Sequence, residues 1–161
     1  MTEPMSASEA AARVAIDDLL HAYAFLVDTH KYDDLAGLFS EDGSITDSNV
    51  GTFTGSADIV RFFTKATQTP LPDGWPQPRL MRHHLTSRRV RLTGDGAATC
   101  DAYFVAMTDT RADHWGRYRD AVTLTPVGWR FATRLLVVEG YAEESWYAAR
   151  LLSVGASSPT T

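Results

Sequence analysis

The chain has 161 residues, of which 44% are hydrophobic and 22% charged, and this favours a single globular domain with a substantial core. Its net charge of -5 argues against a nucleic-acid backbone as a partner, and its one cysteine excludes an internal disulfide. No apolar run is long enough to span a membrane, and the first residues lack the order of a signal peptide. We therefore expect a cytoplasmic protein with no membrane partner.

The N-terminal part of the chain predicts helices. Ser6 and Glu9 have the spacing of a capping box, so a first helix is expected to begin there and to end at 28–31. Its apolar stripe consists of Ile16, Leu20, Tyr23 and Val27. The elements expected next are a short helix with Leu35, Leu38 and Phe39, a turn at 41–43, short strands at 44–47 and 51–54, and a third helix opened by Gly55 and Ser56.

The C-terminal part predicts strands. A proline-rich loop at 70–78 separates the two halves, and beyond it the apolar period changes from helical to alternating. The strands are predicted at 80–92, 97–108, 115–124 and 129–138, with turns at 94–96 and 126–128. Helices followed by long antiparallel strands indicate an α+β fold, in which the helices cover one face of a curved sheet.

The first long strand carries a sign of that curvature. Its apolar residues lie at odd positions up to Leu85 and at even positions from Val90, so we predict a bulge between Thr86 and Arg89. A bulged sheet under helices encloses a cone-shaped cavity. We expect this domain to span 8–152, between flexible tails at 1–7 and 153–161.

His83 and Asp28 are the leading candidate site residues. His83 alternates with Met81 and Leu85 on the apolar face, whereas His84 lies on the other face. A histidine titrates near neutral pH and can serve as an acid or a base. Asp28 ends a helix, where the helix dipole opposes a negative charge, and this favours a functional role. The alternative is that His83 is a satisfied core histidine.

Other residues complete the candidate site. The ring of Tyr23 is expected in the core, with its hydroxyl bound to the backbone or pointing into the cavity. Asp120 alternates with apolar residues, so it could face inward as a second polar group that binds substrate in the cavity, or lie near an open edge. Arg134 could neutralise a substrate acid or form an ion pair. Tyr103, Met81 and Phe63 are further candidates for substrate binding.

The remaining histidines and aromatic residues have simpler interpretations. His21, His30 and His114 are expected at the surface or at helix ends, and Cys100 is expected to be a small buried residue. Trp115, Trp129 and Trp146, three of the four tryptophans, suit packing and rim positions. The sequence contains no glycine-rich phosphate loop, no nucleophilic serine motif and no HxH or HExxH spacing, so we predict neither a metal nor a cofactor.

Four spaced motifs, taken together, resemble a known family. They are Tyr23-Ala-x-x-x-Asp28, Tyr32-x-x-Leu35-x-x-Leu38-Phe39-x-Glu41-Asp42-Gly43, Arg82-His83-x-x-Thr86-Ser87 and Gly128-Trp129-Arg130-Phe131-x-x-Arg134. In this order, over about Ala10 to Tyr141, they resemble the SnoaL-like group of the NTF2-like superfamily. The resemblance implies an NTF2-like cone-shaped α+β barrel.

The resemblance also implies roles for particular residues. In the branch with scytalone dehydratase, bile-acid 7α-dehydratase and lindane dehydrochlorinase, a helix aspartate pairs with a strand histidine, and Asp28 and His83 match these. Tyr23 matches a catalytic tyrosine of the bile-acid enzyme. Scytalone dehydratase has a second histidine on the next strand, where this chain has Ala102 or Tyr103, and this argues against a scytalone-like substrate.

The function implied is that of a cofactor-independent lyase, similar to a dehydratase, or an isomerase. Its substrate would be a small hydrophobic molecule, a cyclic one in view of the branch, and its assembly a homodimer or homotrimer. Two alternatives stay open. One is a non-catalytic module that binds a small molecule, and the other is a small structural subunit similar to the β subunit of ring-hydroxylating dioxygenases.

Overall fold

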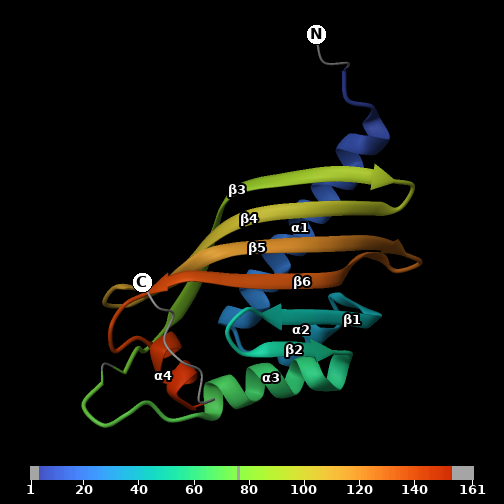
Figure 1. Cartoon of the computed structure of the whole chain (residues 1–161). Helices are drawn as coiled ribbons and strands as arrows, with labels where there is room; N and C mark the ends of the chain where they lie inside the picture. Colours follow the sequence, from blue (N-terminus) through green and yellow to red (C-terminus); the bar gives the residue numbers. More distant parts are fainter. Residues whose placement is uncertain (1–3, 76, 154–161) are drawn as a thin grey trace.

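A computed structural model describes residues 4–75 and 77–153 (Figure 1). The helices are α1 (Ala7–Asp28), α2 (Tyr32–Ala36), α3 (Ser56–Gln68) and α4 (Trp146–Ser153). The strands are β1 (Phe39–Asp47), β2 (Gly51–Thr54), β3 (Met81–Gly94), β4 (Ala97–Thr108), β5 (Ala112–Thr125) and β6 (Gly128–Tyr141). The predicted α+β class is confirmed.

The strands form one curved, unclosed sheet in the order β2-β1-β6-β5-β4-β3. The four long strands are antiparallel neighbours, whereas β1 runs parallel to β6. The register of β3 against β4 shifts between Thr86 and Arg89, and Ser87 has a positive φ of 50°. The bulge predicted from the switch of apolar positions is therefore confirmed, and it allows β3 to bend around the helices.

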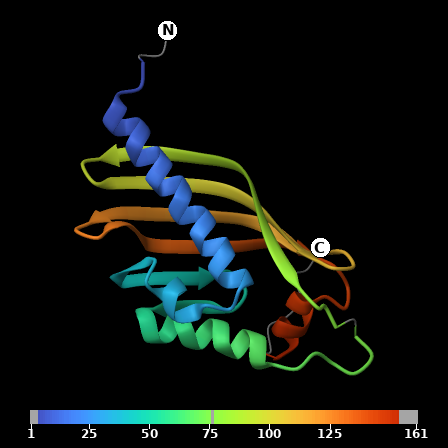
Figure 2. The same ribbon diagram turned by 180° about the vertical axis from the view of Figure 1, so that it is seen from behind.

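The helices cover one face of this sheet, and α1 crosses it diagonally (Figure 2). The capping box at the start of α1 is present: the Glu9 backbone N–H donates to the Ser6 hydroxyl, and the Ser6 N–H donates to the Glu9 carboxylate. The stripe of α1 that packs on the sheet is buried and consists of Ile16, Leu19, Leu20, Tyr23 and Ala24. The helix therefore buries the face that its 3.6-residue period predicts.

The core lies between α1 and the inner face of the sheet. On β4 the inward residues are small apart from Phe104, and they leave room for the helix: Ala98, Cys100, Ala102 and Ala106. Cys100 is 1% exposed, and burial raises the pKa of its thiol to about 12. It is the small buried residue that the alternation predicts, and its thiol stays protonated at neutral pH.

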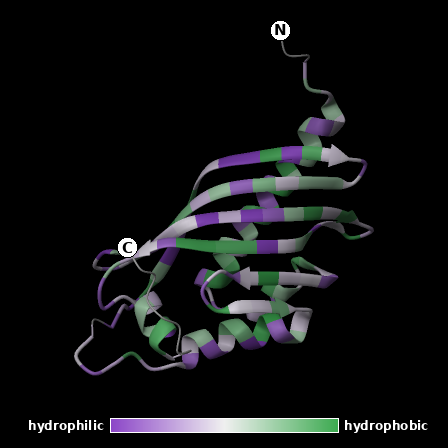
Figure 3. Cartoon of the chain, in the orientation of Figure 1, coloured by the Kyte–Doolittle hydropathy of each residue, from purple (hydrophilic) through white to green (hydrophobic). Residues whose placement is uncertain are grey.

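In the described part of the chain, no helix covers the outer face of the sheet (Figure 1). Polar and apolar residues alternate along the long strands (Figure 3), and some large residues on the outer face are exposed. Tyr103 is 53% and Trp115 42% exposed. Gly140 makes room for Trp115, since a Cβ at Gly140 would lie 2.6 Å from its ring. Two aromatic side chains thus lie on a broad open sheet surface.

Several element bounds differ from the sequence predictions. Leu38 and Phe39 were expected in the second helix, but α2 ends at Ala36 and Phe39 begins β1. The predicted turn at 41–43 lies within β1, where the register against β6 shifts. A Cβ at Gly43 would lie 2.8 Å from the Phe131 carbonyl oxygen, so the glycine permits this close approach. Tertiary pairing with β6 outweighs the local turn signal here.

The end of the chain also differs. The sequence pattern predicted no element after 138, but β6 continues to Tyr141 and α4 follows. Of the two predicted tails, 1–3 and 154–161 lie outside the described residues. No helix in the described part of the chain is long and apolar enough to cross a membrane.

Candidate functional site

A cavity of about 400 Å³ lies between the C-terminal end of α1, the helices α3 and α4, and the first residues of β3 and β5. Seven tyrosine, phenylalanine and tryptophan side chains line it: Tyr23, Tyr32, Phe62, Phe63, Tyr118, Trp146 and Tyr147. The ionisable side chains that line it include Asp28, Asp47, His83, His114 and Arg150. The cavity is therefore largely apolar with a few charged groups, as is common for small-molecule sites.

Asp28 and His83 are in direct contact in this cavity. The Nδ1 atom of His83 lies 2.7 Å from Oδ1 of Asp28, and the backbone N–H of His83 also donates to the carboxylate. The side chain of His83 is 11% exposed, and that of Asp28 is 9% exposed. Because an ionised carboxylate only accepts hydrogen bonds, Nδ1 carries the proton and Nε2 is the basic nitrogen.

The edge position of β3 explains why one carboxylate can reach both groups. β3 pairs only with β4, so alternate backbone N–H groups on its other side have no partner within the sheet. The Asp28 carboxylate accepts a hydrogen bond from the backbone N–H of His83. This donor and the His83 ring offset the unfavourable effect of the helix dipole on a negative charge at the end of α1. His84 lies on the opposite face and is exposed, while Met81 and His83 line the cavity.

A second histidine enters the cavity, and the sequence prediction for it was wrong. His114 was expected at the surface, but it lies on β5, is 3% exposed and lines the cavity. Its ring centroid is 5.7 Å from that of His83, at an interplanar angle of 74°. By the resemblance to scytalone dehydratase, a second histidine would lie on the strand next to β3, where this chain has Ala102 or Tyr103. His114 instead lies on β5, one strand further along the sheet.

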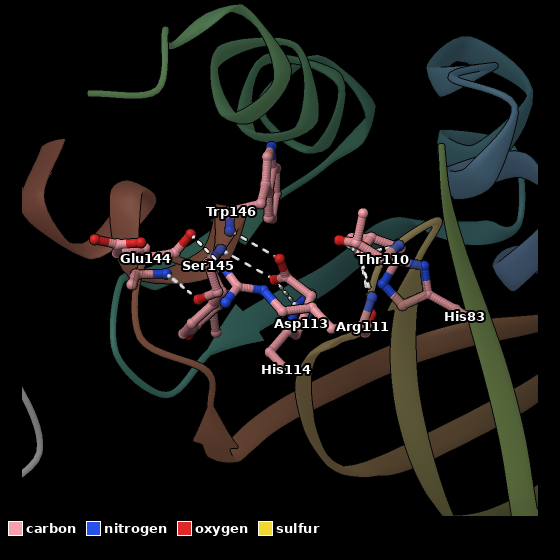
Figure 4. A network of polar contacts seen from close by, with 12 residues as sticks. His83, Thr110, Arg111, Asp113, His114, Glu144, Ser145 and Trp146 are labelled. Carbon is pink, nitrogen blue, oxygen red and sulfur yellow. Dashed lines mark hydrogen bonds and ion pairs between the residues drawn. The ribbon is translucent and has the colours of Figure 1, made fainter. Parts of the chain in front are cut away.

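His114 has a carboxylate partner of its own (Figure 4). Its Nδ1 atom lies 2.9 Å from Oδ2 of Asp113, which also accepts the backbone N–H groups of Trp146 and Tyr147. Asp113 therefore caps the N-terminus of α4 and holds the His114 ring at the same time. As in the His83–Asp28 pair, the proton on Nδ1 leaves Nε2 as the basic nitrogen.

The electrostatics of this second pair keep the ring neutral. Burial lowers the pKa of His114, and the Asp113 carboxylate only partly opposes this effect. Burial alone would raise the pKa of Asp113, but hydrogen bonds from His114, Trp146 and Tyr147 bring it below its ordinary value. At neutral pH the pair is therefore a neutral imidazole and an ionised carboxylate.

One signal in the sequence could have found His114. The inward residues of β5 are even-numbered and include Gly116, Tyr118 and Asp120. The strand was predicted to begin at Trp115, whereas it begins at Ala112. Extending the alternation by one further inward position reaches His114.

Tyr23 lines the cavity and is almost fully buried. Its ring packs edge-on against four aromatic neighbours: Phe39, Phe63, Tyr118 and Phe131. Burial raises the pKa of the Tyr23 hydroxyl, so it remains a proton donor at neutral pH. Of the residues predicted to bind substrate, Met81 and Phe63 also line the cavity.

Asp120 and Arg134 form an ion pair below the floor of the cavity, and neither lines it. The guanidinium donates two hydrogen bonds to the carboxylate, at 2.9 and 2.8 Å. It lies 3.9 Å from the ring centroid of Tyr23 and 4.2 Å from that of Tyr118. Burial alone would lower the pKa of Arg134, but Asp120 more than offsets it and the pKa is raised.

These positions correct three predictions of substrate contact. Asp120 does face inward, as predicted, but its carboxylate is used by Arg134 because a buried charge requires a partner. Arg134 is enclosed by aromatic rings instead of facing a substrate. Tyr103 lies on the outer face of β4, away from the cavity, because odd-numbered residues of that strand face outward.

In residues 4–75 and 77–153, no group of three or more His, Cys, Asp or Glu side chains is placed to hold an ion. Two of the histidines that line the cavity instead pair with carboxylates, His83 with Asp28 and His114 with Asp113. This arrangement can move protons at two imidazole rings whose centroids are 5.7 Å apart.

Known proteins share this architecture. A candidate scytalone dehydratase from Novosphingobium aromaticivorans has a TM-score of 0.73 at 18% identity, over 86% of this chain and 91% of its own. LinA has a TM-score of 0.68 at 18% identity, over 82% and 88% of the two chains. An NTF2-like protein with a cystatin-like fold from N. aromaticivorans is 25% identical, with a TM-score of 0.68 over 88% of each chain.

At the sequence level, no protein of curated function matches the chain. The SnoaL-like domain matches residues 8–135, which include α1, both members of the His83–Asp28 pair, and His114. Together with the curved sheet and the similar solved structures, this match shows that the chain belongs to the SnoaL-like family of the NTF2-like fold.

Proposed function

We propose that this protein is a cofactor-independent lyase, similar to a dehydratase, or an isomerase that acts on a small hydrophobic, cyclic molecule. The observation that carries the proposal is the contact between Asp28 and His83 in a largely apolar cavity. A histidine held by a carboxylate, with its other nitrogen free, is suited to remove a proton from carbon. The likeness to a candidate scytalone dehydratase and to LinA fits this class of reaction.

In the first step, Nε2 of His83 would take a proton from a carbon next to an activating carbonyl group. Asp28 would stabilise the imidazolium that forms, since its carboxylate lies 2.7 Å from Nδ1. The Tyr23 hydroxyl, which burial keeps protonated, would donate a hydrogen bond to the substrate carbonyl as negative charge develops on it.

The second step distinguishes the two reactions. In a lyase, the electron pair of the broken C–H bond forms a C=C bond, and a hydroxyl group leaves as water with the proton from His83. His114 would orient that hydroxyl by accepting its hydrogen bond at Nε2, which Asp113 leaves free. In an isomerase, His83 would return the proton to a different carbon.

The experiment is a search for proton abstraction. A panel of cyclic ketones and β-hydroxy ketones is incubated with the protein in D₂O, and mass spectrometry records deuterium uptake or loss of water. Wild-type protein should exceed His83→Ala by about a hundredfold or more for at least one compound. His84→Ala is the matched control and should behave as wild type, because its ring faces away from the cavity.

If wild-type protein and His83→Ala gave the same result across the panel, catalysis by this pair would be contradicted. The same cavity would then serve the alternative function, binding of a small molecule without turnover. Calorimetric binding of a panel compound that is equal in both proteins would support that alternative.

A further inference from the structure

Arg150 is the one cationic side chain of the described cavity wall that is buried, and it has no carboxylate partner among the described residues. It lies on α4 and is 7% exposed. Its Nη1 donates to the Thr69 carbonyl at 2.6 Å, and its guanidinium stacks on the Trp146 ring at 4.5 Å. Its Nε is buried and has no hydrogen-bond partner in the described part of the chain.

The charge of this side chain persists at neutral pH. Burial lowers the pKa of Arg150 to about 10, which still leaves the guanidinium protonated. A buried cation with unused donors is costly unless an anion or other acceptor approaches it. The carbonyl of Thr69 satisfies one nitrogen, but a neutral acceptor does not neutralise the charge.

The carboxylates in the cavity wall and the one beside it all accept hydrogen bonds from other groups. In the wall, Asp28 accepts from His83, and Asp47 accepts the Tyr147 hydroxyl at 2.9 Å and the Asn49 backbone N–H at 2.9 Å. Asp113, the partner of His114, also accepts from the start of α4. Tyr32 and then Asp113 oppose the effect of burial on the pKa of Arg150, but both oxygens of Asp113 already accept hydrogen bonds.

We propose that Arg150 binds a carboxylate group of the substrate, so that the molecule accepted by this cavity is an organic acid with an apolar body. The inference rests on the proposed function, since it concerns the same cavity, and it adds the substrate class. The carboxylate would contact the guanidinium on α4, the apolar body would lie against Phe62 and Phe63, and the acidic C–H would face His83.

The chemistry of the site favours a carboxylate over a more highly charged group. A single guanidinium matches the charge and the planar geometry of one carboxylate. A phosphate dianion would need more positive charge, but Arg79 is already paired with Asp109, at 2.8 Å, and Arg82 is exposed and donates to the Met81 carbonyl. The stacking of Arg150 on Trp146 also fixes its plane, so less side-chain freedom is lost on binding.

The competing explanation is structural. Arg150 joins α4 to the C-terminal end of α3 through Thr69, which would account for its burial. This contact uses one nitrogen and leaves Nε without a partner. A purely structural role therefore predicts a loss of stability on substitution, but no discrimination between charged and neutral ligands.

The experiment compares two probes of nearly the same shape, 2-naphthoate and 2-naphthamide, by isothermal titration calorimetry. Wild-type protein should bind naphthoate about tenfold or more tightly than naphthamide, the effect of one hydrogen-bonded charge pair. In Arg150→Gln the two affinities should become equal. Arg79→Gln is the matched control, because Arg79 also lines the cavity but is paired, and it should keep the wild-type ratio.

Two further measurements distinguish the loss of a carboxylate-binding group from the loss of the folded structure. Arg150→Lys retains the charge and should retain a preference for naphthoate. In wild-type protein, the NMR signal of the Arg150 Nε–H group, assigned by its loss in Arg150→Lys, should shift with naphthoate and not with naphthamide. Circular dichroism checks that each variant is folded.

Equal affinity of wild-type protein for both probes would overturn the inference, as would binding of neither at millimolar concentration. A preference that survives in folded Arg150→Gln would do the same. His83→Ala should keep the preference for naphthoate while losing turnover. Failure of the proposed reaction and failure of this inference therefore give different results.

Discussion

The carboxylate of Asp28 holds His83 at two points, through the ring nitrogen at 2.7 Å and through the backbone N–H at 3.0 Å. The first contact sets the tautomer of the ring, and the second fixes the edge strand against the end of α1. One side chain thus joins the chemistry of the site to the packing of the fold. The two effects can be separated by substitutions that change the charge but keep the shape.

We expect Asp28→Asn to lower turnover by about a hundred- to ten-thousand-fold with little change in fold. The amide keeps an oxygen that can accept from His83, but it loses the charge that stabilises the imidazolium. Steady-state kinetics with a substrate from the deuterium-exchange panel measures the effect, and circular dichroism checks the fold.

The same pair makes a prediction about additivity. The double variant Asp28→Asn/His83→Ala should be scarcely slower than His83→Ala alone, because the two residues act as a unit. Independent, multiplicative losses would show that Asp28 acts by a route other than His83.

The stability of the protein should depend on His114 below neutral pH. Its pKa in the folded state is lower than the ordinary value of 6.5, so the unfolded chain binds the proton more readily. The stabilisation is complete above pH 6.5 and is lost as the pH falls from there toward the folded-state pKa. Urea unfolding from pH 7.5 to 5.5 should show the free energy of unfolding falling by up to about 1.4 kcal/mol per pH unit from this group.

His114→Gln removes this titration while the amide can still donate to Asp113. The difference in unfolding free energy between wild type and this variant should shrink as the pH falls. His84→Gln serves as the matched control, because His84 is exposed. A difference that stays constant with pH would mean that His114 is protonated equally in both states.

The ion pair of Asp120 and Arg134 should show strong coupling. Removing either partner leaves a buried charge, so Asp120→Leu and Arg134→Met should each cost about 3–5 kcal/mol in unfolding free energy. The double variant should recover most of that loss, because no charge is left unpaired. Denaturant unfolding of all four proteins measures the coupling, and simple additivity would contradict it.

We propose that the protein forms a homodimer or homotrimer through the outer face of the sheet. Tyr103 and Trp115 are exposed there, and burial against a second copy would remove them from water. Light scattering should show an oligomer for wild type and a monomer for the double variant Tyr103→Glu/Trp115→Glu. Val14→Glu, at a position 70% exposed on α1, is the control and should leave the assembly intact. A wild-type monomer at micromolar concentration would rule out this assembly.

The sequence predicted those features that depend on local periodicity. The helical repeat of Ile16, Leu20 and Tyr23 placed α1 on the sheet, because the apolar face of a helix must be buried. The change of apolar face between Leu85 and Val90 located the bulge in β3, because each strand residue points to the face opposite its neighbour. The same alternation separated His83 from His84, since only one of two adjacent strand residues can face the cavity.

Only the tertiary structure decided which polar groups share the cavity and which partners they have. His114 lies beside His83 because both pair with the small residue Ala106 of β4, from its two sides, and this pairing is set by the register of three strands. Helix α4 returns to the cavity mouth because Asp113, 33 residues before Trp146, accepts its first N–H groups. Arg134 is paired and Arg150 is not, although both are buried arginines, because partner choice depends on long-range packing, which sequence spacing does not show.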